Sequence, residues 1–272
     1  FRLEVRTRPR VAILATGSEL IDWQEAEKKP PSPGDIIESN SVLLAGLVRE
    51  AGGDPIVLER QPDELVAVRQ AIDGAVTDDV TMVLVNAGAS AGSKDFTSHA
   101  VKELGEVLVH GVKAMPGKPT LLGRVRGKPV VGTPGYPVSA WVCFDQFVRP
   151  ALERLQGLTP TRRVEVPVIP GRKLPSKLGH EEFVRVHLGR VGDQVVAMPI
   201  KRGAGTITSL TRADGVLRIP PESEGREEGD EVMAELLRSR EAMERTLVVV
   251  GSHDITLDLI ADRLPRHTHG YR

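Results

Sequence analysis

The chain has 272 residues, with 36 Lys and Arg side chains against 37 Asp and Glu, and 40% of its residues are hydrophobic. This length allows one large core, or a main domain with a smaller one. The balanced charge excludes a strongly basic nucleic-acid-binding surface. The single Cys143 excludes an intramolecular disulfide and predicts a reducing, cytoplasmic location. No apolar run approaches the ~20 residues that span a bilayer, so no membrane partner is expected.

Strand and helix patterns alternate along residues 8–157. Short apolar runs predict strands at 11–15, 55–58, 80–85 and 107–109, and a hairpin-like pair around 120–132. Apolar residues at helical spacing predict a helix that Ser39 or Asn40 caps and that stops at Gly52-Gly53. Further helices are predicted from Asp63, near 97–104 and over 137–155, the last disturbed at Pro150. This alternation predicts an α/β fold, a three-layer arrangement in which helices cover both faces of a mostly parallel sheet.

The pattern changes after residue 160. Over 162–240, short β-rich runs alternate with Gly and Pro turns, which predicts a small antiparallel barrel or sandwich. A further βα pattern begins at 246 and the chain ends at Arg272, so we expect 246–272 to be the truncated start of another α/β domain. Because the chain also opens at Phe1 without a methionine, we expect a piece of a longer protein.

A glycine-rich loop follows the apolar run at 80–85. It reads Asn86-Ala-Gly-Ala-Ser-Ala-Gly-Ser-Lys-Asp95 and leads into a predicted helix. Glycines let successive backbone N–H groups face a bound anion, and a helix N-terminus favours the same charge. A carboxylate at Asp95 would repel that anion unless it holds a cation that the anion shares. The loop therefore predicts a phosphate or oxyanion site with a metal, although such loops also serve as plain turns.

Other unusual residues stand at the predicted strand ends, where ligands bind in parallel sheets. Glu19 follows the first strand, a Pro-rich turn at 132–139 precedes the long helix, and Lys113 and Lys118 bracket a Pro-Gly turn. With Asp63, these carboxylates and lysines are typical of a metal-assisted phosphate site. Plainer interpretations stay open: Asp63 and Asp95 are helix caps, Glu19 is a helix-start carboxylate, and the lysines are solvated.

Four motifs in order resemble one family. They are Thr16-Gly-Ser-Glu-Leu20, Ser93-Lys-Asp-Phe-Thr97, Lys113-Ala-Met-Pro-Gly-Lys-Pro119 and Gly132-Thr-Pro-Gly-Tyr-Pro-Val-Ser-Ala140, and they resemble the molybdopterin molybdenumtransferases, the MoeA and gephyrin E-domain family. The resemblance implies a MogA-like molybdopterin-binding domain over 8–157 and a C-terminal β-barrel domain over 162–240. It also implies that 246–272 begins a periplasmic-binding-protein-like domain.

The resemblance implies an enzyme that inserts molybdenum from molybdate into adenylylated molybdopterin, with Mg²⁺-dependent release of AMP, and that acts as a homodimer. By this resemblance, Glu19, Asp63 and Asp95 are catalytic and hold the metal. The implied substrate-binding residues are Gly88, Ser90, Gly92, Ser93, Lys94, Lys113, Lys118, Pro134, Gly135, Pro137 and Ser139. The chain departs from the family pattern at Ala87, Ala89 and Tyr136, and at Gln61-Pro62-Asp63, where an Asp-Asp pair is common. In the family a further N-terminal lobe completes the site across a dimer, and we do not expect that lobe in this chain, so we expect weak binding and poor turnover in this chain alone.

Two other functions fit the same residues. One is molybdopterin adenylyltransferase, which shares the α/β domain but normally lacks the β-rich region that follows here. The other is a non-catalytic module that binds molybdopterin or molybdate or acts as a scaffold, which the altered loop favours.

Overall fold

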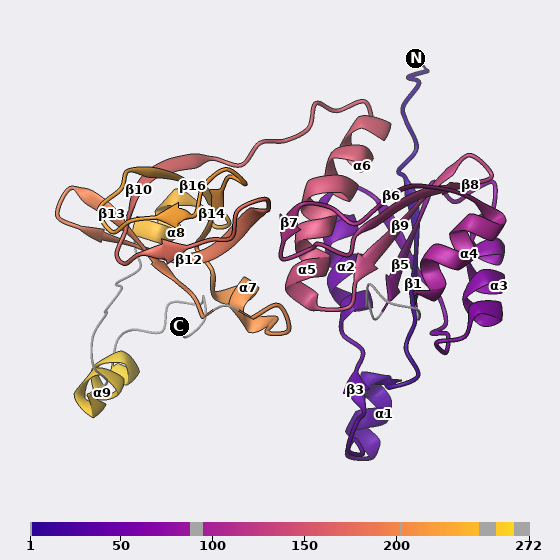
Figure 1. Cartoon of the computed structure of the whole chain (residues 1–272), viewed down its shortest axis with the longest axis horizontal. Helices are drawn as coiled ribbons and strands as arrows, with labels where there is room; N and C mark the ends of the chain where they lie inside the picture. The colour runs from indigo at the N-terminus through magenta and orange to yellow at the C-terminus, as the bar shows by residue number, and fades with distance from the viewer. Residues whose placement is uncertain (1, 88–94, 202, 245–253, 264–272) are drawn as a thin grey trace.

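A computed structural model describes residues 2–87, 95–201, 203–244 and 254–263 of the chain. It contains an α/β part and a β-barrel, which lie side by side and are joined by the segment 156–164 (Figure 1). The predicted fold class is therefore confirmed. Within the described residues, no helix is long and apolar enough to cross a membrane.

The α/β part is built on a six-stranded sheet. Its order is β4 (Asp54–Val57), β1 (Arg10–Ala15), β5 (Met82–Ala87), β9 (Lys128–Pro134), β8 (Leu121–Val125) and β6 (Gly105–His110). The first four strands are parallel, and β8 and β6 add antiparallel neighbours. Because β1, β5 and β9 are parallel, their carboxyl ends lie together at one edge of the sheet.

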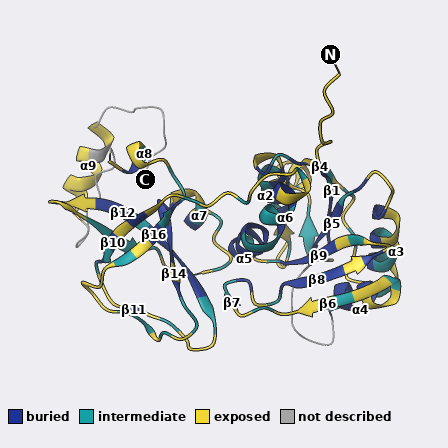
Figure 2. Ribbon diagram, turned by 90° about the horizontal axis from the view of Figure 1, so that it is seen from above, coloured by how far each residue is buried: buried dark blue, intermediate teal, exposed yellow. Residues whose placement is uncertain are grey.

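Helices cover both faces of this sheet. Helices α3 (Leu65–Ala75) and α4 (Phe96–Leu104) lie on one face, and α2 (Asn40–Glu50), α5 (Pro137–Cys143) and α6 (Arg149–Leu155) lie on the other (Figure 1). Strand β1 serves both layers, because Ala12 and Leu14 pack into the first core and Val11 and Ile13 into the second. Strand β1 is buried along almost its whole length, in the dark blue of Figure 2. A strand that is buried on both faces is a continuous apolar run in sequence.

The long helix predicted over 137–155 is interrupted ahead of Pro150, the point expected from the sequence. A π-helical turn, η1 (Phe144–Val148), separates α5 from α6, and the Arg149 N–H donates to the Phe144 carbonyl five residues earlier. Pro150 has no N–H to donate, and its ring would clash with a carbonyl one turn earlier. A wider turn ahead of the proline accommodates both effects.

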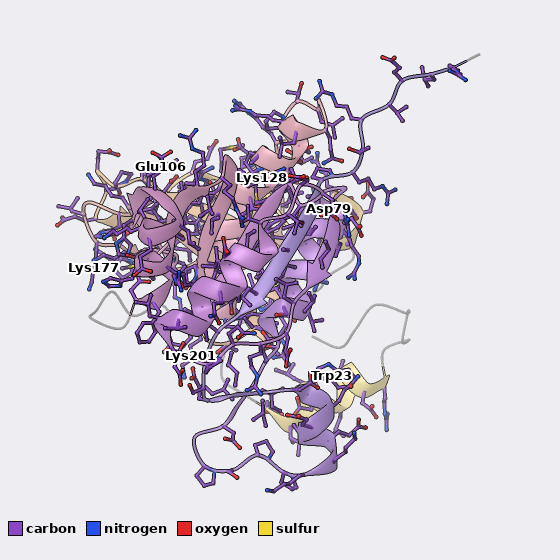
Figure 3. The ribbon with its side chains drawn as sticks, turned by 90° about the vertical axis from the view of Figure 1, so that its right-hand side faces the viewer. Trp23, Asp79, Glu106, Lys128, Lys177 and Lys201 are labelled. Carbon is purple, nitrogen blue, oxygen red and sulfur yellow. The ribbon has the colours of Figure 1, made fainter. Side chains whose placement is uncertain are left out.

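A small arm after β1 has no counterpart in the sequence-based prediction. It comprises β2 (Leu20–Ile21), α1 (Trp23–Lys28) and β3 (Ile36–Ile37), and it projects from the sheet (Figures 1 and 3). The Asp22 carboxylate caps α1 by accepting the Gln24 N–H. Helix α1 has no buried residue, so it leaves no apolar periodicity in the sequence.

The second part is a closed barrel rather than a sandwich. Its strands are β10 (Glu165–Pro170), β12 (Glu181–Val191), β13 (Gln194–Pro199), β14 (Gly215–Ile219) and β16 (Val232–Leu236). They pair in the order β13-β10-β16-β14-β12, and β12 pairs with β13 to close the ring. Only the β10–β13 pairing in this ring is parallel. Val184, Val186 and Leu188 of β12 fill its interior.

Shorter elements complete the described barrel region. They are β11 (Leu174–Pro175), paired with β15 (Gly225–Arg226), and the helices α7 (Thr208–Arg212) and α8 (Arg240–Glu244). Beyond the barrel, helix α9 (Ile255–Arg263) lies within the βα pattern predicted from 246. The strand predicted at 246–250 lies outside the described residues, so a further domain stays a prediction.

The two parts share a packed interface. Strand β7 (Ala114–Met115) leaves the α/β part and pairs in parallel with Glu181 and Glu182 of β12. An apolar cluster joins Ala114, Trp141 and Val142 of the α/β part to Phe183 and Val216 of the barrel. The barrel is therefore held against α5 and the segment that precedes β8.

Cys143 is expected to be unreactive in the folded protein. It is fully buried, and this burial raises the pKa of its thiol to about 12, so almost none of it is thiolate near neutral pH. An Ellman titration at pH 8 should detect the thiol only after denaturation. Rapid labelling of the native protein would contradict this placement.

Candidate functional site

The predicted site segments leave the sheet at one edge. Ala15 of β1 lies beside Asn86 of β5, and Ala87 of β5 lies beside Pro134 of β9. The chain then continues from these three strand ends into the segment with Glu19, the glycine-rich loop and the Pro-rich turn. Gly88, Ser90, Gly92, Ser93 and Lys94 of that loop lie outside the described residues, and their roles stay predictions.

A buried amide network fixes two of the strand ends. The Asn86 side chain donates to Thr133 Oγ1 at 3.1 Å and to the Pro134 carbonyl at 2.9 Å. The Asn40 amide donates to Asn86 Oδ1 at 3.0 Å and to the Gly135 carbonyl at 2.6 Å. Asn40 was predicted only as a helix cap, and its buried Oδ1 has no partner among the described residues. Pro134 and Gly135 are therefore held rigidly at the candidate site.

The segments of Glu19 and Asp63 lie next to each other. The Gly17 N–H donates to the Gln61 carbonyl at 3.0 Å, and the Asp63 N–H donates to Ser18 Oγ at 3.2 Å. Between these segments lies a cavity of about 260 Å³, lined by Gly17, Ser18, Arg60, Gln61 and Pro62. Asp63 is exposed and precedes α3, whose cap position is occupied by Glu64.

Asp95 is held from two sides. Its Oδ1 accepts the Ser98 N–H at 3.0 Å and so caps α4, as the plainer interpretation expected. Its Oδ2 lies 2.7 Å from His110 Nε2. The sequence-based prediction omitted His110, although its place at the end of a predicted strand gave a signal.

The lysine loop, residues 111–119, is fixed by backbone hydrogen bonds while its lysines reach solvent. The Gly111 N–H donates to the Thr120 carbonyl and the Val112 N–H to the Lys118 carbonyl, each at 2.8 Å. The Lys113 carbonyl accepts the Glu181 N–H of the barrel, also at 2.8 Å. Both lysine side chains are exposed, so their charges are available to a ligand.

The barrel contacts the Pro-rich turn directly. Pro137 occupies the first turn of α5, Ser139 is buried, and the Val138 N–H donates to the Ala204 carbonyl at 3.0 Å. In the same barrel loop, a Cβ added at Gly205 would lie 3.5 Å from the Tyr136 ring. The loop 203–207 therefore covers one side of the candidate site.

Arg185 of β12 is a second residue that the sequence-based prediction missed. It is 6% exposed, and by strand alternation it shares with Phe183 the face that is turned toward the α/β part. Its guanidinium donates to the Gly203 carbonyl at 3.2 Å, while its buried Nε has no partner among the described residues. Burial lowers the pKa of this guanidinium below its ordinary value. The described residues therefore leave this buried donor without an acceptor.

The described residues do not form a metal cage. Within them, no three His, Cys, Asp or Glu side chains come together as a group that could hold a metal ion. Glu19, Asp63 and Asp95, which were predicted to do so together, are therefore not gathered in one cluster. Asp95 is held by Ser98 and His110 at the start of α4, whereas Asp63 lies beside Ser18.

Comparison with known proteins agrees with this architecture. Residues 12–154, more than half of the chain, match the family described as "Probable molybdopterin binding domain". Residues 168–237, which contain most of the barrel, match the "MoeA C-terminal region (domain IV)". The α/β part is thus of the molybdopterin-binding class, and the chain belongs to the MoeA family.

Individual relatives show the same likeness. A Methanocaldococcus jannaschii protein named for molybdopterin biosynthesis is 36% identical over 232 residues, which are 83% of this chain and 54% of the relative. Molybdopterin molybdenumtransferase 2 of Mycobacterium tuberculosis is 34% identical over 224 residues, covering 80% and 54%. The crystal structure of the MoeA protein of Pyrococcus horikoshii has a TM-score of 0.71 at 34% identity, covering 85% and 55%. This chain therefore spans about half the length of these relatives.

Proposed function

We propose that the chain acts in molybdenum cofactor biosynthesis as a molybdopterin molybdenumtransferase. It would insert molybdenum from molybdate into adenylylated molybdopterin, with release of AMP. The observation that carries this proposal is the convergence of the Pro-rich turn, the strand ends and a barrel loop, joined by the bond from Val138 N–H to the Ala204 carbonyl. The relatives named as molybdenumtransferases support the same reaction.

The proposed residues act mainly through charge. Lys113 and Lys118, with the predicted loop residues from Gly88 to Lys94, would hold the phosphates. The positive charge of the lysines next to the pyrophosphate offsets the negative charge that grows on the leaving phosphate in the transition state. Pro134, Gly135, Pro137 and Ser139 would shape the same cleft.

Magnesium is part of the proposal, but the described carboxylates do not build its site. When bound, Mg²⁺ would neutralise phosphate charge, and it commonly binds through substrate phosphates and only one or two carboxylates. Glu19, Asp63 and Asp95 are spread over separate segments, so no step of the reaction is assigned to a cage of all three.

Arg185 extends the proposal to the oxyanion. Its buried Nε lies on the barrel face beside the loop that covers the candidate site, and a guanidinium binds oxyanions through paired N–H groups. We therefore assign Arg185 to hold the anionic substrate from the barrel side.

A second copy of the protein, in a homodimer, is proposed as the partner.

The alternative functions differ in what they require. An adenylyltransferase needs only the α/β part, so the closed barrel and its contact with Val138 favour the molybdenumtransferase. A non-catalytic binding module would use the same pocket residues, and only turnover separates it from the enzyme.

Ligand binding gives the first test. Adenylylated molybdopterin with molybdate and Mg²⁺, at one hundred times Kd, is expected to raise the Tm by about 5–10 °C through mass action. Glu19→Ala and Asp95→Ala should reduce this shift or abolish molybdenum insertion in a protein that contains all of the family's domains. Unchanged insertion in both variants would leave the binding module as the better function, and no Tm shift with the wild type would contradict both.

A further inference from the structure

The pair formed by Asp95 and His110 joins two segments of the candidate site. Asp95 is the last residue of the glycine-rich loop and the cap residue of α4, whereas His110 is the last residue of β6. The two side chains meet at 2.7 Å, and the Asp95 side chain is only 20% exposed. The same carboxylate also accepts the Ser98 N–H, so its orientation is fixed at both oxygens.

His110 stands where the lysine loop leaves the sheet. Gly111 follows it with φ +88°, a conformation that favours glycine, and turns the chain out of β6. The next residues carry Lys113 and Lys118 and return to Thr120 through backbone hydrogen bonds. Any movement of His110 therefore moves the start of the loop that presents both lysines.

We propose that His110 is a positioning residue of the candidate site. An ionised carboxylate only accepts hydrogen bonds, so the proton of the pair lies on Nε2 and is donated to Asp95 Oδ2. This bond ties the end of β6 to the start of α4, and it sets the lysine loop against the end of the glycine-rich loop. The inference rests on the proposed function, because it assumes that the two lysines bind the phosphates of the substrate.

The contact through Nε2 allows a matched pair of variants. A glutamine at position 110 places its amide nitrogen near the position of Nε2, whereas an asparagine reaches only the position of Nδ1. His110→Gln therefore retains the donor to Asp95 and His110→Asn loses it, although both residues are polar amides. General destabilisation of β6 would affect both variants alike.

The test is the affinity of the whole chain for adenylylated molybdopterin, measured by calorimetry. In metal sites, a residue that hydrogen-bonds to a ligand-binding side chain contributes about 10–100-fold to affinity. For His110→Ala and His110→Asn we therefore expect the affinity to fall by about tenfold. His110→Gln should bind like the wild type. Lys113→Ala and Lys118→Ala serve as reference variants that must weaken binding. Lys177 is an exposed barrel residue (Figure 3), and Lys177→Ala serves as a variant that must not weaken it. The Tm without ligand verifies folding.

The outcomes separate the inference from the function on which it rests. Weaker binding by the lysine variants with unchanged binding by His110→Asn would overturn the positioning role alone. Equal losses in His110→Gln and His110→Asn would also overturn it, since the donated hydrogen bond would then be irrelevant. Unchanged binding in Lys113→Ala and Lys118→Ala would overturn the proposed phosphate site, and the inference with it.

Discussion

Replacing Asp145 with alanine is expected to lower the free energy of unfolding by about 3–5 kcal/mol, because it removes the buried carboxylate that two partly buried guanidinium groups share. Asp145 is 4% exposed in the π-helical turn. Arg163 bonds both of its oxygens, at 2.9 and 2.5 Å, and Arg149 lies 2.8 Å from Oδ1. The loss should appear in urea unfolding followed by circular dichroism.

The position of Arg163 explains why this ion pair matters to the whole molecule. Arg163 lies in the segment between the two parts, and its guanidinium stacks over the Trp141 ring with 5.2 Å to the centroid. It also lies 3.6 Å from Glu235 on β16 of the barrel. Without Asp145, the arginine loses the acceptor that directs it between α5 and the barrel, so the interface should loosen as well.

An exposed aspartate provides the control. Asp73 lies on α3, is 54% exposed and pairs with Arg126 at 3.0 Å. Exposed ion pairs contribute less than about 1 kcal/mol, so Asp73→Ala should change stability little. Both aspartates lie in helical segments, which makes the gain in helix propensity similar. Equal effects of the two substitutions would show that Asp145 does not stabilise the fold through its burial.

Much of the fold could be predicted because its cause is local. The apolar run 80–85 predicted β5, since a strand covered on both faces needs apolar side chains at every position. For the same reason the run 11–15 predicted a strand, and the segment after it and the turn at 132–139 were placed at strand ends. The strand boundaries differ from the predicted ones by a few residues, because strand ends depend on pairing with neighbouring strands. The predicted strand 80–85, for example, is β5 at Met82–Ala87.

The site partners could not be predicted, because they come together only in three dimensions. His110 meets Asp95 across 15 residues of sequence, because β6 packs against α4 and brings its own end to the start of that helix. Asn40 meets Asn86 across 46 residues, and no local pattern distinguishes it from an ordinary helix cap. Arg185 occupies an outward strand position, which sequence reasoning assigns to solvent until a loop from the same barrel covers it.

Arg185→Met is expected to weaken the binding of the anionic substrate by about 10–100-fold, because a hydrogen bond to a charged group contributes about 1.5–3 kcal/mol. The same change should leave the Tm without ligand unchanged or higher. Arg185 places a charge in a buried position with an unpartnered Nε, and an apolar side chain of similar volume there is often neutral or stabilising. Calorimetric binding and thermal unfolding of one protein preparation measure both quantities.

The opposite signs of these two effects separate a binding role from a structural one. If the main task of Arg185 were to hold the loop through the Gly203 carbonyl, Arg185→Met would lower the Tm and move the loop away from Val138. Arg190→Met, at an exposed position on the same strand, should change neither quantity. A lower Tm with unchanged affinity would assign Arg185 to the fold, whereas retained stability with weaker binding would identify a residue whose buried charge is kept for the ligand.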